Sequence, residues 1–167
     1  MKRQKRKYET PTRPFDKLRM EKERVLLKDF GLRRKREVWR SEALLRKYRR
    51  LARELAAHRD SEKESVLINK LIKMGILNQG ATLDDVLGLN IVNILERRLS
   101  TVVFKKGLAR SVKQARQFVA HGLVLIGNRK ISYPSYLVPK DEESKIHVKT
   151  SSQQKVIAVE SGDKNAS

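Results

Sequence analysis

The stretch over residues 111–131, SVKQARQFVAHGLVLIGNRKI, changes its hydrophobic spacing halfway, and this change restricts the fold more than any other feature. In its first half, Val112, Ala115 and Val119 recur at the spacing of one face of a helix. In its second half, the apolar run 124–126 has the length of a short strand. Helix and strand signals this close together predict an α+β fold.

Start and stop signals frame the predicted helix. Ser111, with Gln114 three residues later, forms a Ser-x-x-Gln capping box, which is a specific start signal. Gly122 stands where a glycine commonly ends a helix. We therefore expect one short helix between Ser111 and Gly122, with its polar side carrying Lys113 and Arg116.

Turn signals frame the predicted strands. Gly127 and Asn128 form a two-residue hairpin turn, so a returning strand is expected over residues 129–132. A last strand is expected over residues 145–149, after the acidic turn DEES. The C-terminal half thus predicts a small module of two to three helices packed on a short, mostly antiparallel sheet, near the lower size limit for independent folding.

The clearest helix of the N-terminal half is predicted over residues 41–60, with Ser41 as its N-cap. Apolar side chains form one stripe and arginines form the opposite stripe. Arginines at this spacing repel one another unless an anion covers them, and the planar guanidinium fits phosphate. A solvated face with Glu42 paired to Arg46 is the alternative. The apolar stripe is Leu44, Tyr48, Leu51 and Leu55, and the arginine stripe is Arg46, Arg49, Arg50 and Arg53.

Further helices follow from spacing and from cap residues. Thr82, with Asp85 three residues later, is an acidic version of the capping box. We therefore interpret Asp84 and Asp85 as helix-start residues rather than as an acid–base pair. The predicted helices are 15–30, ended by Gly31; 66 to Gly75 or Gly80; the helix capped by Thr82; and one continuous helix from 91 to a stop at Gly107.

Four parts are predicted along the chain. The basic start, which contains Pro11 and Pro14, is expected to be extended and to become ordered only against a partner, or to be a solubilising tail. The polar end is expected to lack structure apart from a short strand over residues 156–159. The parts are a basic arm at 1–14, a helical domain at 15–95, the α+β module at 96–149 and a polar tail at 150–167.

The charge of the chain indicates its class of partner. The 167 residues include 39 Lys and Arg against 19 Asp and Glu, a net charge of +20 that opposes compaction unless a polyanion neutralises it. Residues 97–116 hold seven cations and no acid, whereas a merely solvated surface usually mixes both signs. We therefore expect a nucleic-acid-binding face there.

Other classes of protein find little support. Without cysteine there is no thiolate nucleophile, disulfide or thiolate zinc site, and the three histidines, His58, His121 and His147, are scattered. Neither a glycine-rich phosphate loop nor a long apolar run occurs, so no small-molecule substrate, membrane association or signal peptide is expected. We expect a soluble protein that is not an enzyme, with no cofactor and no bound metal.

The candidate binding residues lie on helix flanks and on the hairpin. Only Tyr133 and Tyr136 lie near the module's cations, so we expect contacts with phosphates of a structured RNA rather than stacking on splayed single strands. The candidates in the helical domain are Arg46, Arg49, Arg50 and Arg53, and those in the module are Arg97, Arg98, Lys105, Lys106, Arg110, Ser111, Lys113, Arg116, Arg129 and Lys130.

The segment LERRLSTVVFKKGLARSVKQARQFVAHGLVLIGNRKISYPSYLV resembles the RNA-binding module of the small-subunit ribosomal protein four family, which also occurs in some pseudouridine synthases and tyrosyl-tRNA synthetases. The upstream segment from KYETPTRPF to LAREL and the segment GATLDDVLGLNIVNILERRL resemble the archaeal and eukaryotic branch, so the likeness covers roughly residues 7–149. Bacterial members usually have Asp where Ser100 stands and Asn-Gly where this chain has Gly127-Asn128, and some hold zinc through N-terminal cysteines.

The resemblance implies a primary binder of small-subunit ribosomal RNA. It implies a cytoplasmic protein in the small ribosomal subunit that sits on a multi-helix RNA junction, assembles early, and lies beside neighbouring ribosomal proteins and messenger RNA near the mRNA entrance channel. By match to the family motif, the RNA-facing residues would be Arg97, Arg98, Lys105, Arg110, Ser111, Lys113, Arg116 and Lys130.

Three alternatives remain open at this point. A pseudouridine synthase would need a catalytic domain after the module, and only 18 residues follow Lys149. A DNA-binding helix-turn-helix protein is disfavoured by the strand signal after Gly122. A free RNA chaperone or rescue factor built on the same module would differ from a ribosomal protein in not sedimenting with the small subunit.

Overall fold

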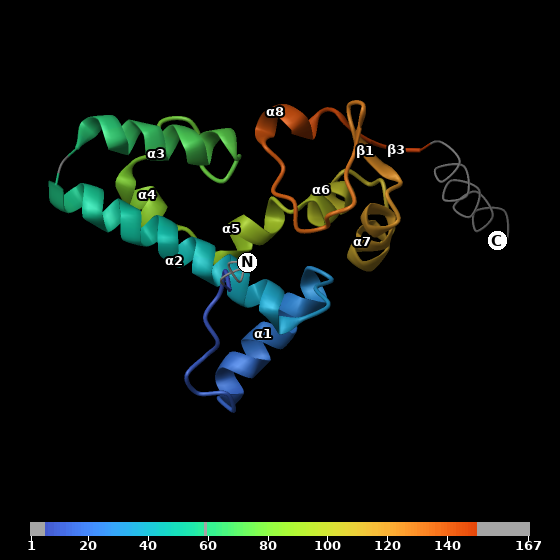
Figure 1. Cartoon of the computed structure of the whole chain (residues 1–167), viewed down its shortest axis with the longest axis horizontal. Helices are drawn as coiled ribbons and strands as arrows, with labels where there is room; N and C mark the ends of the chain where they lie inside the picture. The colour runs from blue at the N-terminus through green and yellow to red at the C-terminus, as the bar shows by residue number, and fades with distance from the viewer. Residues whose placement is uncertain (1–5, 59, 150–167) are drawn as a thin grey trace, which may run out of the picture. The chain divides into compact units, whose positions relative to one another are not determined.

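The computed structural model describes residues 6–58 and 60–149, and the chain divides into two compact units, one ending at Leu95 and one beginning at Glu96 (Figure 1). The described part is mainly helical, with one three-stranded antiparallel sheet in the second unit. This confirms the predicted α+β class. The predicted strand over residues 156–159 lies outside the described residues.

The first unit is built around one long helix, α2, with α1, α3 and α4 packed along it (Figure 1). At its N-terminal end, Leu32, Val38 and Leu95 are buried together, with Trp39 packed against them. The Asp85 carboxylate accepts the backbone N–H of Thr82 at 2.8 Å, which confirms the predicted acidic cap of α4. The helices are α1 (Lys17–Asp29), α2 (Lys35–His58), α3 (Ser61–Lys73), α4 (Leu83–Gly88) and α5 (Ile91–Glu96).

The predicted start of α2 at Ser41 is wrong, because the helix begins six residues earlier at Lys35. Ser41 is buried inside the helix, and its hydroxyl donates to the Glu37 carbonyl at 3.2 Å. The Glu37 carboxylate instead accepts the backbone N–H of Arg33 at 3.3 Å, at the true helix start. The buried stripe shifts accordingly and comprises Val38, Ser41, Leu45, Tyr48 and Ala52.

The second unit is the predicted module. Its sheet has the order β2-β1-β3, and both pairings are antiparallel. The register pairs Ile126 with Arg129, which confirms the two-residue turn at Gly127 and Asn128. One core joins the sheet to α6 and α7, with Leu99, Val119 and Val124 fully buried. The elements are α6 (Leu99–Lys105), α7 (Val112–Ala120), β1 (Val124–Ile126), β2 (Arg129–Lys130), α8 (Lys140–Glu143) and β3 (Ile146–Val148).

The caps of α7 follow the sequence signals with one change. The Ser111 hydroxyl accepts the Gln114 N–H at 3.2 Å, and Gly122 follows the helix with a positive φ of 67°. The Gln114 side chain, however, accepts the N–H of Arg110 at 2.8 Å, one residue before the donor that a capping box uses. The predicted helix bounds are therefore confirmed, and the two cap contacts satisfy the backbone N–H groups of Gln114 and Arg110.

The continuous helix predicted from residue 91 to Gly107 is wrong, because it breaks at Arg97 and Arg98 into α5 and α6. Arg98 is extended and forms a β-bridge with Leu137. The Leu99 N–H donates to the Tyr136 carbonyl at 2.8 Å, and the Val138 N–H donates to the Arg97 carbonyl at 2.9 Å. This pairing with a distant loop replaces the helical hydrogen bonds that the periodicity predicted.

Within the described residues, no helix is both long enough and apolar enough to cross a membrane. The same part of the chain holds no group of three or more histidine, aspartate or glutamate side chains arranged to bind a metal ion.

Candidate nucleic-acid interface

Helix α7 presents cations on the side away from the core. Ala115 and Val119 are buried, whereas Lys113 is exposed and Arg116 is half-buried. Residues three apart lie on the same face of a helix, so Lys113 and Arg116 follow one another along it. Within residues 6–58 and 60–149, the Lys113 side chain makes no ion pair or hydrogen bond, which leaves its ammonium available to an external anion.

The hairpin brings a further cation to the C-terminal end of α7. The side chain of Lys130 lies over Gly122, where its terminal carbons occupy the place of any Cβ on that residue. Lys130 is exposed and, in the described part of the chain, has no acidic partner. An ammonium is favoured at a helix C-terminus, where the backbone carbonyls carry partial negative charge. We call Lys113, Arg116 and Lys130 the α7 cations.

Arg97 and Arg98 lie among internal contacts of the module. The Arg97 side chain is 14% exposed, pairs with Glu143 at 2.9 Å and donates to the Val138 carbonyl at 2.8 Å. Arg98 is 4% exposed. The exposed flank expected at these two positions is therefore wrong, because the α5–α6 break turns the Arg97 side chain toward the loop and α8, and because Arg98 is buried. Their arrangement supports the fold of the module.

Acidic residues from elsewhere in the module contact several other candidates, through a carboxylate or a backbone carbonyl. Lys105 pairs with Glu96 at 3.1 Å, and Lys106 donates to the Glu143 carbonyl. Arg129 pairs with Glu142 at 2.7 Å. These acids lie outside the window 97–116, so the absence of acid within that window did not mean that its cations were unpaired.

Glu142 also fixes an aromatic residue. It accepts the Tyr136 hydroxyl at 2.8 Å, and burial together with this hydrogen bond raises the pKa of Tyr136. A neutral phenol next to a carboxylate keeps its proton, so Tyr136 acts here as a hydrogen-bond donor that ties the loop to α8.

Ser111 and Arg110 stand at the start of α7, where Ser111 is the N-cap and Arg110 is exposed.

The arginines of α2 are not equivalent. Arg49 is half-buried and donates to the Leu89 carbonyl, so it joins α2 to the end of α4. Arg53 is exposed, and its Nε donates to the Arg49 carbonyl at 3.3 Å. Arg50 lies 3.3 Å from Glu54 in an exposed pair. Such pairs are worth about 0–1 kcal/mol, so Arg50 can exchange its partner for a phosphate at little cost.

The arm, expected to be ordered only against a partner, lies on α2 over its described residues. The Tyr8 and Trp39 rings are 5.9 Å apart, and Glu9 lies 3.6 Å from Arg46. Arg46 thus interacts with both the arm and Glu42: burial raises the pKa of Glu42, and the charge of Arg46 opposes that rise.

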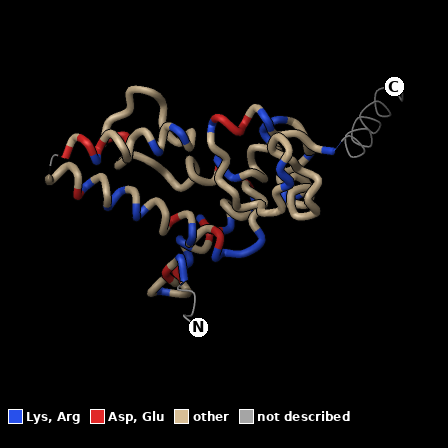
Figure 2. The backbone as a smooth tube through the Cα atoms, turned by 45° about the horizontal axis from the view of Figure 1, so that its top comes forward, with Lys and Arg blue, Asp and Glu red and all other residues tan. Residues whose placement is uncertain are grey.

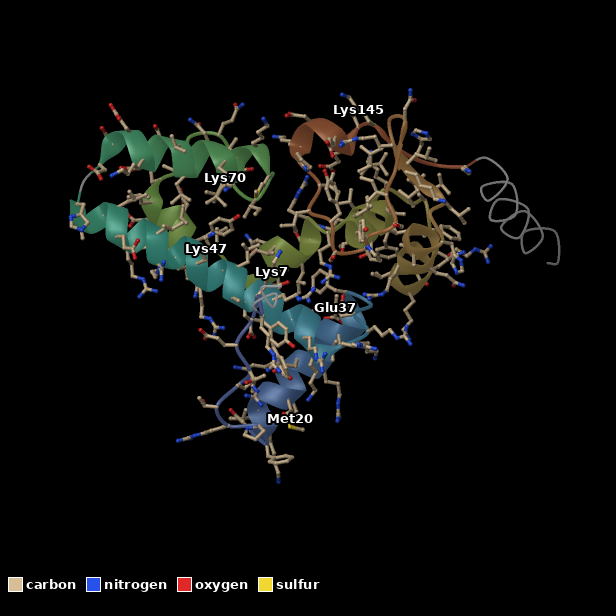
Figure 3. All side chains as sticks on the ribbon, viewed as in Figure 1. Lys7, Met20, Glu37, Lys47, Lys70 and Lys145 are labelled. Atoms are coloured by element: carbon tan, nitrogen blue, oxygen red, sulfur yellow. The ribbon has the colours of Figure 1, made fainter. Side chains whose placement is uncertain are left out.

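The arm and α2 together line an open groove that the sequence reasoning missed. Figure 2 shows Lys and Arg recurring along α2, and Figure 3 labels Lys7 on the arm and Lys47 on α2. The basic start of the chain was the only signal for it, and nothing in the sequence indicated which helix it would meet. The cations that line this arm groove are Arg6, Lys7, Arg46, Lys47 and Arg50, with Glu9 beside them.

Comparisons with known proteins identify one family. Residues 97–144 match the S4 domain. The small ribosomal subunit protein uS4 of Sulfurisphaera tokodaii is 48% identical over 149 residues, which cover 87% of this chain and 84% of that protein. The uS4 protein of Methanoregula boonei is 49% identical over 147 residues, covering 83% and 80%.

A third relative is matched over still more of its length. The uS4 protein of Methanothermobacter thermautotrophicus is 46% identical over 154 residues, which cover 90% of each chain. The likeness therefore includes the helical first unit as well as the S4 domain, which separates this chain from proteins that share the S4 domain alone. The chain belongs to the uS4 family of small-subunit ribosomal proteins.

Proposed function

We propose that this protein is a structural constituent of the small ribosomal subunit and that it binds the RNA of that subunit. The observation that carries the proposal is the match to uS4 proteins over both units, joined to exposed or half-buried cations on each unit. In the first unit these are the cations of the arm groove, and in the second they are the α7 cations. As part of the small subunit, the protein acts in the cytoplasm beside neighbouring ribosomal proteins.

The binding mechanism is phosphate neutralisation by side chains held on rigid elements. Ammonium and guanidinium groups displace condensed counterions from the RNA, and this release supplies affinity that falls with salt. The α7 helix fixes the backbone positions of Lys113 and Arg116 through its buried face and its caps, so both charges lie on one rigid element before binding. Such contacts recognise the shape of a folded RNA rather than its base sequence.

The finer placement is also part of the proposal. A protein with two basic units on one chain can contact two segments of RNA at once, which suits a multi-helix junction and an early step in subunit assembly. We place it near the mRNA entrance channel, where messenger RNA is a further neighbour. We propose no catalytic reaction for it: its role is to hold folded RNA.

Charge reversal at one of the α7 cations tests the proposal. Arg116→Glu should weaken binding to small-subunit RNA by at least tenfold while the circular dichroism of the protein stays unchanged. Lys140→Glu, an equal charge change on α8, serves as the matched control and should have a smaller effect. Unchanged binding by Arg116→Glu would contradict the assigned interface.

Competition and footprinting separate the remaining alternatives. Folded small-subunit RNA should outcompete duplex DNA at moderate salt, and equal affinity for both would favour general polyanion binding. A hydroxyl-radical footprint should show protection clustered where several RNA helices meet. In cell extract, absence of the protein from the small-subunit fraction would indicate a free RNA-binding factor.

A further inference from the structure

A second pocket of the first unit lies where the arm passes the start of α2, on the side of Trp39. Its volume is about 830 Å³, and, like the arm groove, it is open to solvent. Four cations line it, Arg6, Arg34, Lys35 and Arg36, and no acidic side chain does. The pocket therefore favours an anionic group.

Two aromatic rings line the same pocket, in a chain in which aromatic residues make up only 5% of the sequence. Tyr8 comes from the arm and Trp39 from α2, with their ring planes 41° apart. The Arg40 guanidinium lies 5.9 Å from the centre of the Tyr8 ring and holds the arm in place. A planar ligand could thus contact aromatic rings within reach of cations.

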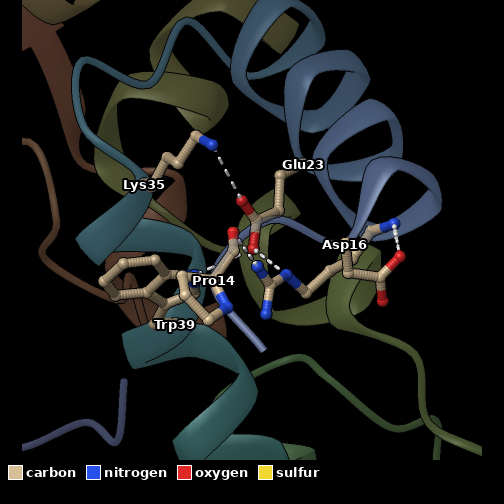
Figure 4. A network of polar contacts seen from close by, with 6 residues as sticks. Pro14, Asp16, Glu23, Lys35 and Trp39 are labelled. Carbon is tan, nitrogen blue, oxygen red and sulfur yellow. Dashed lines mark hydrogen bonds and ion pairs between the residues drawn. The ribbon is translucent and has the colours of Figure 1, made fainter. Parts of the chain in front are cut away.

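A network of buried polar contacts fixes the tryptophan (Figure 4). The Trp39 indole N–H donates to Glu23 at 2.9 Å, and the Glu23 side chain is only 2% exposed. Arg19 and Lys35 pair with the same carboxylate at 3.3 and 3.6 Å. Because one edge of the indole is tied to α1, the ring is held in place before any ligand binds.

We propose that this pocket binds one unstacked nucleotide of single-stranded RNA, with its base against Tyr8 and Trp39 and its phosphate near Arg34 and Arg36. Base–aromatic stacking contributes about 1–3 kcal/mol per base, and arginine adds contacts with both phosphate and base. The α7 cations by contrast offer charge without an adjacent ring pair. The inference rests on the proposed function, since it assumes that RNA reaches the first unit, but it names a different kind of contact.

The single tryptophan of the chain is a built-in reporter for this pocket. The full chain is titrated with a single-stranded RNA pentanucleotide while the fluorescence of Trp39 is followed. Stacking should quench this fluorescence, whereas tripolyphosphate and a blunt-ended RNA duplex should bind without comparable quenching. Equal quenching by tripolyphosphate, or binding of the pentanucleotide with no quenching, overturns the proposal.

Variants locate the contact. Tyr8→Ala should weaken pentanucleotide binding about tenfold, which corresponds to about 1.4 kcal/mol. Arg36→Gln, which leaves the arm in place, should reduce the salt slope of log K by about 0.7. Arg24→Gln on the outer side of α1 removes the same charge away from the pocket and should change neither quantity. Equal effects of Arg36→Gln and Arg24→Gln would overturn the proposal.

Binding of full-length small-subunit RNA tests the proposed function separately from the pocket inference. If the chain binds that RNA but Trp39 does not respond to unpaired nucleotides, the pocket inference fails and the proposed function stands. If the chain shows no preference for that RNA at all, the proposed function itself fails.

Discussion

At the scale of single residues, the backbone next to Lys130 matters as much as its charge. Gly122 and Gly107 both follow helices with positive φ, of 67° and 71°, so an alanine at either position is strained by the backbone alone. Around Gly107 there is open space, whereas at Gly122 an added methyl group would overlap the end of the Lys130 side chain. The two glycines thus form a matched pair.

We predict that Gly122→Ala and Gly107→Ala lose similar stability, about 1 kcal/mol each, but that only Gly122→Ala lowers RNA affinity. Urea unfolding measures the first quantity and RNA titration the second. In a Lys130→Ala background, Gly122→Ala should have no further effect on RNA affinity. Additive losses in the double variant would show that Gly122 does not act through Lys130.

The contact of Lys130 with Gly122 could not be predicted from the sequence, although the end of the helix at Gly122 was predicted. The helix stop at Gly122 depends on local backbone conformation, which a glycine after an apolar helix signals well. Which side chain crosses the glycine depends on the hairpin register, a tertiary property. The same distinction holds at Ser111: its role as N-cap was predicted, but the hydrogen bond from the Arg110 N–H to the Gln114 side chain was not.

At the scale of helices, Glu23 joins α1 to α2. Its carboxylate is buried and contacts Arg19, Lys35 and the Trp39 indole at once. Removing one partner of a buried ion pair leaves the remaining charges uncompensated and typically costs about 3–5 kcal/mol. Because Arg19 and Lys35 are partly exposed, with side chains 24% and 44% accessible, the lower end of this range applies.

We predict that Glu23→Ala lowers the free energy of unfolding by about 3 kcal/mol, measured by urea denaturation. Glu21→Ala, which removes an exposed carboxylate from the same helix, should change it by no more than about 0.5 kcal/mol. If the two variants behave alike, the buried network does not hold α1 in place.

The contact between Tyr136 and Glu142 predicts a dependence on alkaline pH. Burial and this hydrogen bond raise the pKa of the Tyr136 phenol, so the folded state favours the protonated form. The stability from this preference is fully present below the ordinary tyrosine pKa of about 10 and is lost as pH rises above it.

Thermal unfolding should therefore show wild-type protein losing stability above about pH 10 faster than Tyr136→Phe does. Tyr133→Phe is the control, because Tyr133 is 72% exposed and should follow wild type. If the stability of Tyr136→Phe falls with pH in parallel with that of wild type, ionisation of the Tyr136 phenol does not cause the loss of stability.

The breaks between elements were harder to predict than the elements. Leu95 and Leu99 fit one helical stripe, but Leu95 is buried in the core of the first unit and Leu99 in that of the second. Separate cores require a break that periodicity alone does not reveal. The early start of α2 was missed because no Ser, Thr, Asp or Asn precedes Lys35 as an ordinary N-cap.

At the scale of the whole molecule, a net charge of +20 predicted the class of partner but not which cations meet it. Glu143 lies 46 residues from its partner Arg97, and Glu142 lies 13 residues from Arg129, so local charge counts missed both pairings. The family could be identified from motif residues, whereas the sorting of cations into paired and unpaired required the fold.

The central claim is that unpaired cations, Lys113 and Lys130 above all, contact RNA phosphates, while internally engaged ones such as Lys106 support the module. The most direct measurement is the slope of log K against log salt concentration for binding to small-subunit RNA. About eight phosphate contacts give a wild-type slope near −7, at about −0.9 for each phosphate. Lys113→Gln and Lys130→Gln should each make the slope shallower by about 0.9, and Lys106→Gln should leave it unchanged. Unaltered slopes for Lys113→Gln and Lys130→Gln, or an equal change for Lys106→Gln, would contradict the account.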